Sequence, residues 1–193
     1  MIQAQLKLRL NNVQEARLVG WLWNLTSVWN WAIRKIELDA KDKIYYYTPK
    51  DFQNLLANHS EKLKIPTHTL QGILLQAHSG WARCFKKLAK KPRFKGVRNK
   101  LNSVPFPDPI KPPKGNHIGV PGLGTVRFHK QELPEGKIKC GRIVRRASGW
   151  YLCLFMATDR EPIERKDCGK VGIDPGFQST CSPSPHLTGN GKR

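Results

Sequence analysis

The sequence predicts an α+β protein in which a small β-barrel receives an inserted helical lobe. Three observations lead to this fold class. The chain opens with a strictly alternating apolar pattern, continues with helical spacing, and then becomes rich in glycine and proline with short extended pieces. The opening strand needs partners, and the later short strands can supply them. We therefore expect the barrel to comprise residues 1–10 and 92–160, and the helical lobe to comprise residues 11–91.

The opening strand spans residues 3–10, where polar and apolar residues alternate without a break. Alternation with a period of two is typical of a half-buried strand. The inward residues are then Ala4, Leu6, Leu8 and Leu10. Asn11 and Asn12 follow, and either side chain can cap a helix that begins after them.

A long helix is predicted from Val13 to about Lys41, because apolar residues recur at intervals of three or four. This stripe consists of Leu18, Leu22, Leu25, Trp29, Ala32 and Ile36. Trp21, Trp23 and Trp31 lie partly off the stripe. Two interpretations stay open: a broad helix face buried against two neighbouring helices, or one or two rings that stack on nucleic-acid bases.

Two further helices complete the predicted lobe. Thr48 as N-cap, with Pro49 at the first helical position and an acid at Asp51, indicates a helix that breaks near residues 58–60. A longer helix begins at Pro66. Its apolar residues are Leu70, Ile73, Leu74, Ala77, Trp81, Phe85 and Leu88.

The region after Lys91 contains several short extended pieces. They are residues 92–95, 102–106, 117–120, 124–129, 137–146 and 150–158. The last two form a predicted hairpin around residues 147–149, with Trp150, Leu152, Leu154 and Met156 on one face. Residues 161–167 are a charged linker, and a further unit begins at Cys168.

The charge balance indicates a polyanionic partner. The chain has 34 Lys plus Arg against 14 Asp plus Glu, a formal net charge of +20. Nucleic acid is the commonest polyanion that such a protein meets, and a membrane surface is the competing one. No apolar run approaches the length of a membrane span and no signal-peptide pattern opens the chain, so we expect a cytoplasmic protein.

The cysteine pattern argues against a disulfide framework. The five cysteines are scattered, odd in number and contain no Cys-x-x-Cys pair. We therefore expect free thiols in a reducing compartment and no local zinc site.

The densest positive stretch is residues 83–100, which we call the basic segment. It contains nine Lys or Arg and no acid, interleaved with Phe85 and Phe94. A helix macrodipole accounts for two or three such residues but not for nine, so phosphate binding is predicted here. With three later arginines, the predicted nucleic-acid-binding residues are Arg83, Lys86, Lys87, Lys90, Lys91, Arg93, Lys95, Arg98, Lys100, Arg142, Arg145 and Arg146.

A candidate catalytic carboxylate, Asp174, follows a predicted buried strand that starts at residues 170–173. Pro175 and Gly176 then turn the backbone, although Asp-Pro-Gly is also an ordinary turn. Two-metal cleavage of a phosphodiester requires several carboxylates, and no Asp or Glu follows Gly176. Asp174 is thus also the one candidate metal ligand, and a single Asp does not hold Mg²⁺ usefully.

These features together resemble the TnpB family, the OrfB-type proteins encoded beside transposases in bacterial insertion sequences and related to compact type V CRISPR effectors. The match runs from about residue 1 to 180 and rests on the opening strand, the Trp-rich helix with Asn30 and the helix from Pro66. It also includes three motifs: Lys91-Pro92-Arg93-Phe94-Lys95-Gly96, Ile118-Gly119-Val120-Pro121-Gly122-Leu123-Gly124 and Gly172-Ile173-Asp174-Pro175-Gly176.

The resemblance implies an RNA-guided DNA endonuclease that acts in transposition. Its wedge-type barrel and helical recognition lobe would hold guide RNA and target DNA, in a nucleoid-associated location. A RuvC-like nuclease of RNase H fold would cut with Mg²⁺. Asp174 matches that nuclease's first catalytic Asp, so residues 168–180 would be the start of an incomplete nuclease. The family's later acids and zinc ribbon have no counterpart, and residues 181–193 are expected to be an aberrant, disordered tail.

Three functions follow as expectations. The first is the nucleic-acid-binding N-terminal part of a TnpB-like protein, inactive alone because its nuclease is truncated. The second is a non-cleaving module that occupies guide RNA or DNA, for example as a repressor. The third is a general basic RNA-binding protein in which Asp174 is a plain turn residue.

Overall fold

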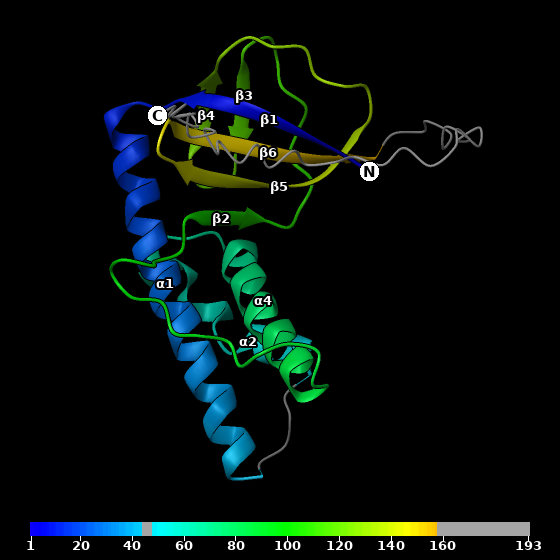
Figure 1. Ribbon diagram of the computed structural model, residues 1–193. Coiled ribbons are helices and arrows are strands. Elements are labelled where there is room, and N and C mark those ends of the chain that lie inside the picture. The colour runs from blue at the N-terminus through cyan, green and yellow to red at the C-terminus, as the bar shows by residue number, and fades with distance from the viewer. Residues whose placement is uncertain (44–47, 158–193) are drawn as a thin grey trace, which may run out of the picture. The chain divides into compact units, whose positions relative to one another are not determined.

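The computed structural model describes residues 1–43 and 48–157 and has a mixed α+β architecture. The chain divides into a compact unit of residues 1–159 and a second of residues 160–193. In the first unit, six antiparallel strands form one sheet that curls into a half-barrel, and the described helices lie between the first and second strands in the sequence (Figure 1). The α+β prediction is thereby confirmed.

The sheet has the strand order β2-β5-β6-β1-β4-β3. The strands are β1 (Ile2–Arg9), β2 (Ser103–Phe106), β3 (His117–Val120), β4 (Gly124–Phe128), β5 (Lys137–Arg146) and β6 (Gly149–Ala157). β1 pairs with β6 on one side and with β4 on the other, so the opening strand lies inside the sheet, with later strands on both sides. The helices are therefore an insertion into the sheet.

Strand alternation places the predicted apolar residues in the core. Leu6 of β1 is fully buried and aligns with Leu152 of β6, which is also fully buried. The four predicted inward residues of the last hairpin are all buried. Leu10 is an exception, because β1 ends at Arg9 and Leu10 is only half-buried.

The inserted helices are held by caps that the sequence predicts. They are α1 (Asn12–Lys41), α2 (Pro49–Asn54), the 3₁₀ turn η1 (Ala57–His59), α3 (Ser60–Leu63) and α4 (Thr67–Phe85). The Asn11 side chain accepts a hydrogen bond of 2.8 Å from the Gln14 amide, and Thr48 caps α2 through the Asp51 amide. A helix break was expected at residues 58–60. These residues are instead helical and belong to η1 and α3.

The two glycines of α4 mark close contacts rather than weak points. A Cβ at Gly72 would lie 3.3 Å from Pro105 of β2, where the helix packs against the sheet. A Cβ at Gly80 would lie 3.3 Å from Pro92, in the segment after the helix. Each glycine therefore allows a proline ring to approach the helix axis.

α4 ends earlier than its apolar pattern predicts. The amides of Lys87 and Leu88 donate to the carbonyls of Cys84 and Arg83, and Lys87 has a φ of +58°. This is a Schellman arrangement with a lysine in the left-handed position. Phe85 and Leu88 are 45% and 69% exposed, so the prediction that they extend the buried stripe is wrong.

A hairpin turn joins the sheet to the helices. β3 and β4 are connected by Pro121, Gly122 and Leu123, and Gly122 has a φ of +73°. The carbonyl of Gly122 accepts a hydrogen bond of 2.9 Å from the Arg17 guanidinium. A Cβ at this position would lie only 2.8 Å from Pro66 and 3.0 Å from the Trp21 ring, so glycine alone fits.

Several predictions fall on residues outside the described ranges. These are the linker 161–167, the nuclease start at residues 168–180 with Asp174, and the tail 181–193.

Candidate nucleic-acid interface

From Lys91 onward the basic segment runs along α1, in the direction opposite to that of the helix. The Trp29 indole donates a hydrogen bond of 3.1 Å to the Arg93 carbonyl. Further on, the amide of Leu101 donates to the Thr26 hydroxyl at 3.2 Å. Residues 92–95 therefore form no strand, contrary to the prediction, because α1 side chains bond their backbone instead.

The central attachment is made by Asn30. Its amide nitrogen donates to the Lys95 carbonyl and its amide oxygen accepts from the Lys95 amide, both at 2.8 Å. One side chain thus satisfies both backbone groups of one residue, as a neighbouring strand would do. The backbone is therefore fixed at Lys95, while most basic side chains of the segment stay exposed.

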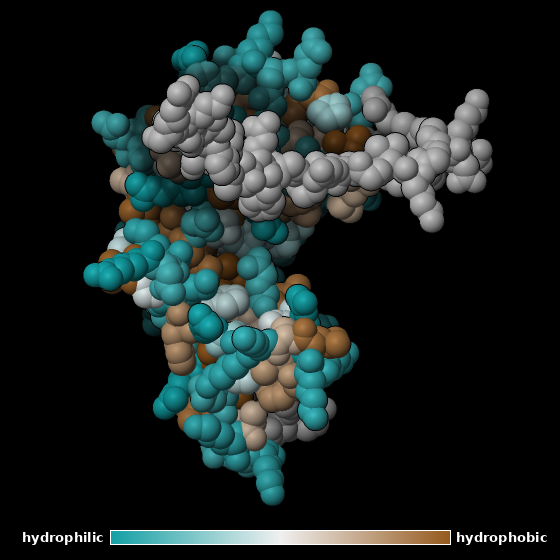
Figure 2. Space-filling model, in the orientation of Figure 1, coloured by the Kyte–Doolittle hydropathy of each residue, from teal (hydrophilic) through white to brown (hydrophobic). Residues whose placement is uncertain are grey.

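Most of the nine basic residues in the segment are exposed to solvent. Lys95 and Lys100 are half-buried. The exposed residues are Arg83, Lys86, Lys87, Lys90, Lys91, Arg93 and Arg98. Figure 2 shows hydrophilic side chains projecting over the helical part of this face, with apolar patches between them.

One carboxylate lies beside the segment. Glu37 of α1 is 2.7 Å from the Lys91 ammonium, and Arg34 and Lys41 lie 3.9 and 3.8 Å from it. The hydrogen bond from Lys91 lowers the pKa of Glu37 from its ordinary value of 4.5. Three cations share this single acid. Within residues 1–43 and 48–157, Lys91 is the one member of the basic segment that forms a salt bridge.

Two tryptophans of α1 are partly exposed: Trp23 lies near the basic segment, and Trp31 lies near α2. The Lys100 ammonium lies 4.4 Å from the centroid of the Trp23 ring, a cation–π contact. The Trp31 ring stacks on Phe52 of α2 with centroids 6.0 Å apart. Trp21 is different, because it is buried and donates a hydrogen bond of 2.6 Å to the Lys64 carbonyl.

The three predicted arginines of β5 are divided between the two faces of the sheet. The backbone amide of Arg145 donates to the Asn102 carbonyl at 2.8 Å, so this residue adjoins the end of the basic segment. Arg142 and Arg146 lie on the opposite face by strand alternation. Their guanidinium groups lie over Phe155 and Tyr151, at 5.5 and 5.1 Å from the ring centroids.

Sequence reasoning missed further cations on the sheet. The six strands contain no Asp or Glu, and their basic residues are Lys7, Arg9, Arg127, Lys137, Lys139, Arg142, Arg145 and Arg146. His129, which follows β4, has both ring nitrogens 3.3 Å from the Arg9 guanidinium. Partial desolvation lowers the pKa of His129, and the charges of Arg9 and Lys7 lower it further. The sequence signal that could have found these cations is their place at the polar positions of the alternating strands.

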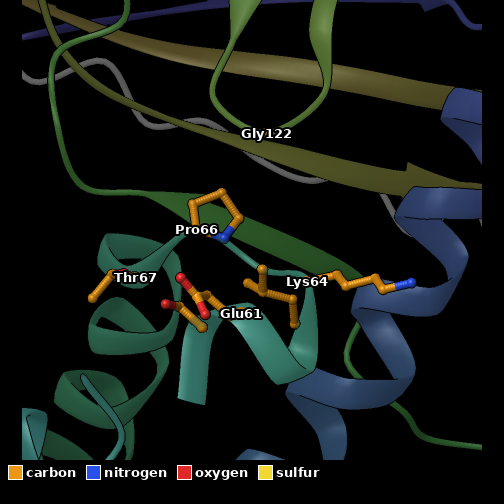
Figure 3. Close-up of a pocket in the computed structure, with 7 residues that line it drawn as sticks. Glu61, Lys64, Pro66, Thr67 and Gly122 are labelled. Carbon is orange, nitrogen blue, oxygen red and sulfur yellow. The ribbon is translucent and has the colours of Figure 1, made fainter. Parts of the chain in front are cut away.

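Other features of the described residues do not form a comparable site. A pocket of about 400 Å³ lies where α3 meets α4, below the Gly122 turn (Figure 3). Its lining residues are Ser60, Glu61, Lys64, Ile65, Pro66, Thr67 and Gly122. Residues 1–43 and 48–157 contain no group of three or more metal-ligating side chains, and none of their helices is long and apolar enough to cross a membrane. Cys84, Cys140 and Cys153 are free thiols.

Comparisons with protein-family models and with curated proteins found no match to this chain.

Proposed function

We propose that this protein binds nucleic acid and that the basic segment contacts its phosphates. The observation that carries the proposal is the arrangement of residues 83–100. The segment contains nine cations and no acid, and seven of the nine are exposed. Its backbone is attached to α1 by hydrogen bonds at Arg93 and Lys95. A polyanion that neutralises such a surface releases its counterions, which favours binding.

The attachment to α1 supports binding rather than mere solubility. A flexible basic tail also attracts phosphates, but it loses conformational entropy when it binds. Here Trp29 and Asn30 already hold the backbone of the segment at Arg93 and Lys95, and Thr26 holds the chain just after it, at Leu101. Phosphate contacts of this kind position a ligand without reading its sequence.

At the level of a family, we propose that the chain is the nucleic-acid-binding part of a TnpB-like protein and that its ligand is a guide-type RNA together with DNA. The motifs at residues 91–96 and 118–124 support this proposal, as does the insertion of helices into an antiparallel sheet. On this proposal the sheet would be the wedge barrel and the helices the recognition lobe. The cleaving role of Asp174 and Mg²⁺ is not part of the proposal, because Asp174 lies outside the described residues.

Sequencing of the nucleic acid that copurifies with the chain tests the family-level proposal. A single defined transcript, encoded next to the gene for this protein, is the expected result. Bulk ribosomal RNA would instead indicate a general basic RNA-binding protein. Recovery of DNA fragments without any RNA would favour the repressor-like alternative.

A further inference from the structure

Two tryptophan rings emerge on the exposed side of α1. Trp23 is 41% exposed and Trp31 is 39% exposed, which is unusual for the largest apolar side chain. They are eight residues apart, so they lie about 12 Å apart along the helix axis and on adjacent parts of its surface. Ser27, between them, is exposed as well.

Each ring is already oriented by a contact within the protein. The ammonium of Lys100 lies over the Trp23 ring, and Phe52 stacks on the Trp31 ring with an interplanar angle of 17°. These contacts fix the rings and leave about two fifths of each side chain open to a ligand.

The basic segment follows the same stretch of α1. Lys91 meets Glu37 near one end, Lys95 meets Asn30 in the middle, and Lys100 meets Trp23 at the other end. From Trp23 to Glu37 the helix rises about 21 Å, which is the length of about six nucleotides stacked at 3.4 Å. A row of cations therefore passes Trp23. Trp31 directly follows Asn30, so it lies about 100° further round the helix, beside Phe52 of α2.

We propose that Trp23 and Trp31 stack on unpaired bases, and that the ligand of this face is a single-stranded nucleic acid. This rests on the proposed function and names the form of nucleic acid. Aromatic platforms beside a cationic track are the general means of binding single strands. A duplex offers its phosphates but keeps its bases inside, so it would leave both rings unused. The positive charge of the face also opposes the docking of a second copy of this chain.

The test compares two labelled strands of equal length, an oligothymidylate and an abasic deoxyribose-phosphate strand. The wild-type protein is expected to bind the oligothymidylate at least about tenfold more tightly, because each stacked base contributes a substantial share of the affinity. Trp23→Ala and Trp31→Ala should each reduce this preference about fivefold or more and leave the affinity for the abasic strand unchanged. Val13→Ala, an exposed apolar truncation on the same helix, should change neither affinity.

Three results would overturn the inference. Equal wild-type affinity for both strands would exclude stacking, and this comparison does not depend on the folding of any variant. An equal loss of affinity for both strands in the tryptophan variants would assign the rings a structural role, which thermal unfolding would reveal. If the tryptophan variants change the sedimentation of the protein but not its preference between the two strands, the rings contact a second copy of the chain instead of bases. If neither strand binds at low salt, the proposed function itself fails.

Discussion

The side chain of Asn30 and the backbone of Lys95 form a reciprocal pair of hydrogen bonds, both 2.8 Å long. Asn30 lies on the long helix and Lys95 lies 65 residues later, in the second half of the basic segment. This pair links the most positive stretch of the chain to its longest helix. The arrangement of the candidate interface depends on it.

Replacement of Asn30 by alanine should therefore release the backbone of the basic segment at Lys95. Two part-buried hydrogen bonds are lost, so we expect the free energy of unfolding to fall by about 1–3 kcal/mol. Urea denaturation measures this change, and amide hydrogen exchange at Lys95 should accelerate. Ser27→Ala is the control, because that exposed side chain bonds only within α1. Unchanged stability together with unchanged exchange at Lys95 would contradict the role given to Asn30.

Gly122→Ala should be more destabilising than Gly124→Ala. Both glycines have positive φ angles, so alanine is strained at either position. At Gly122 the added Cβ would also meet Pro66 at 2.8 Å, whereas nothing lies within 4 Å at Gly124. We expect Gly122→Ala to cost about 1–3 kcal/mol more, measured by denaturant unfolding. Equal losses for the two variants would show that the turn does not pack on the helices.

Glu37 should stabilise the protein in a pH-dependent manner. Its folded-state pKa is lowered by Lys91, so its contribution is present above the ordinary carboxyl pKa of 4.5 and is lost as the pH falls through the lowered value. Glu37→Gln should thus be less stable than the wild type at neutral pH, and the two should converge in acid. Thermal unfolding at a series of pH values measures the difference. A difference that persists or grows in acid would contradict the ion pair.

The exposed lysines after α4 should dominate the salt dependence of binding. Lys86, Lys87 and Lys90 are exposed and form no salt bridge with any described residue, whereas Lys91 is paired with Glu37. Replacing these three by alanine should reduce the log–log salt slope by about two units, since each phosphate contact contributes about 0.7 for a single strand.

A charge-matched control separates location from net charge. Lys50, Lys62 and Lys111 are exposed and lie outside the basic segment. Their triple alanine variant removes the same charge and should leave the slope nearly unchanged. Equal effects from the two triple variants would mean that binding follows overall charge and not the basic segment.

The sequence predicted the elements whose residues follow a simple period, and turn signals also located β2, β3 and β4. Alternation identified β1 and β6, and the turn at residues 147–149 paired β6 with β5. The cap at Asn11 and the helix start at Thr48-Pro49 were predicted from local capping chemistry, and the structure has both. The predicted end of α4 was wrong. The apolar pattern continues through Phe85 and Leu88, but the helix stops because Lys87 takes a left-handed conformation that favours glycine. No local rule predicts a lysine there.

The basic residues were predicted from composition, but their attachment to α1 was not predicted. Nothing in residues 92–95 indicates that α1 side chains replace a strand partner, because the bond between Asn30 and Lys95 joins residues far apart in the sequence. The exposure of Trp23 and the burial of Trp21 also depend on which helices and loops pack nearby. Periodicity placed both rings off the main stripe and could not separate them.

The most direct test of the central claim is the affinity of the purified chain, freed of bound nucleic acid, for a labelled single-stranded RNA over a range of salt concentrations. We predict binding at low salt that weakens with a log–log slope of several units, as expected when multiple cations contact phosphates. Absence of binding at low ionic strength, or an affinity that does not respond to salt, would contradict the claim that residues 83–100 form a phosphate-binding surface.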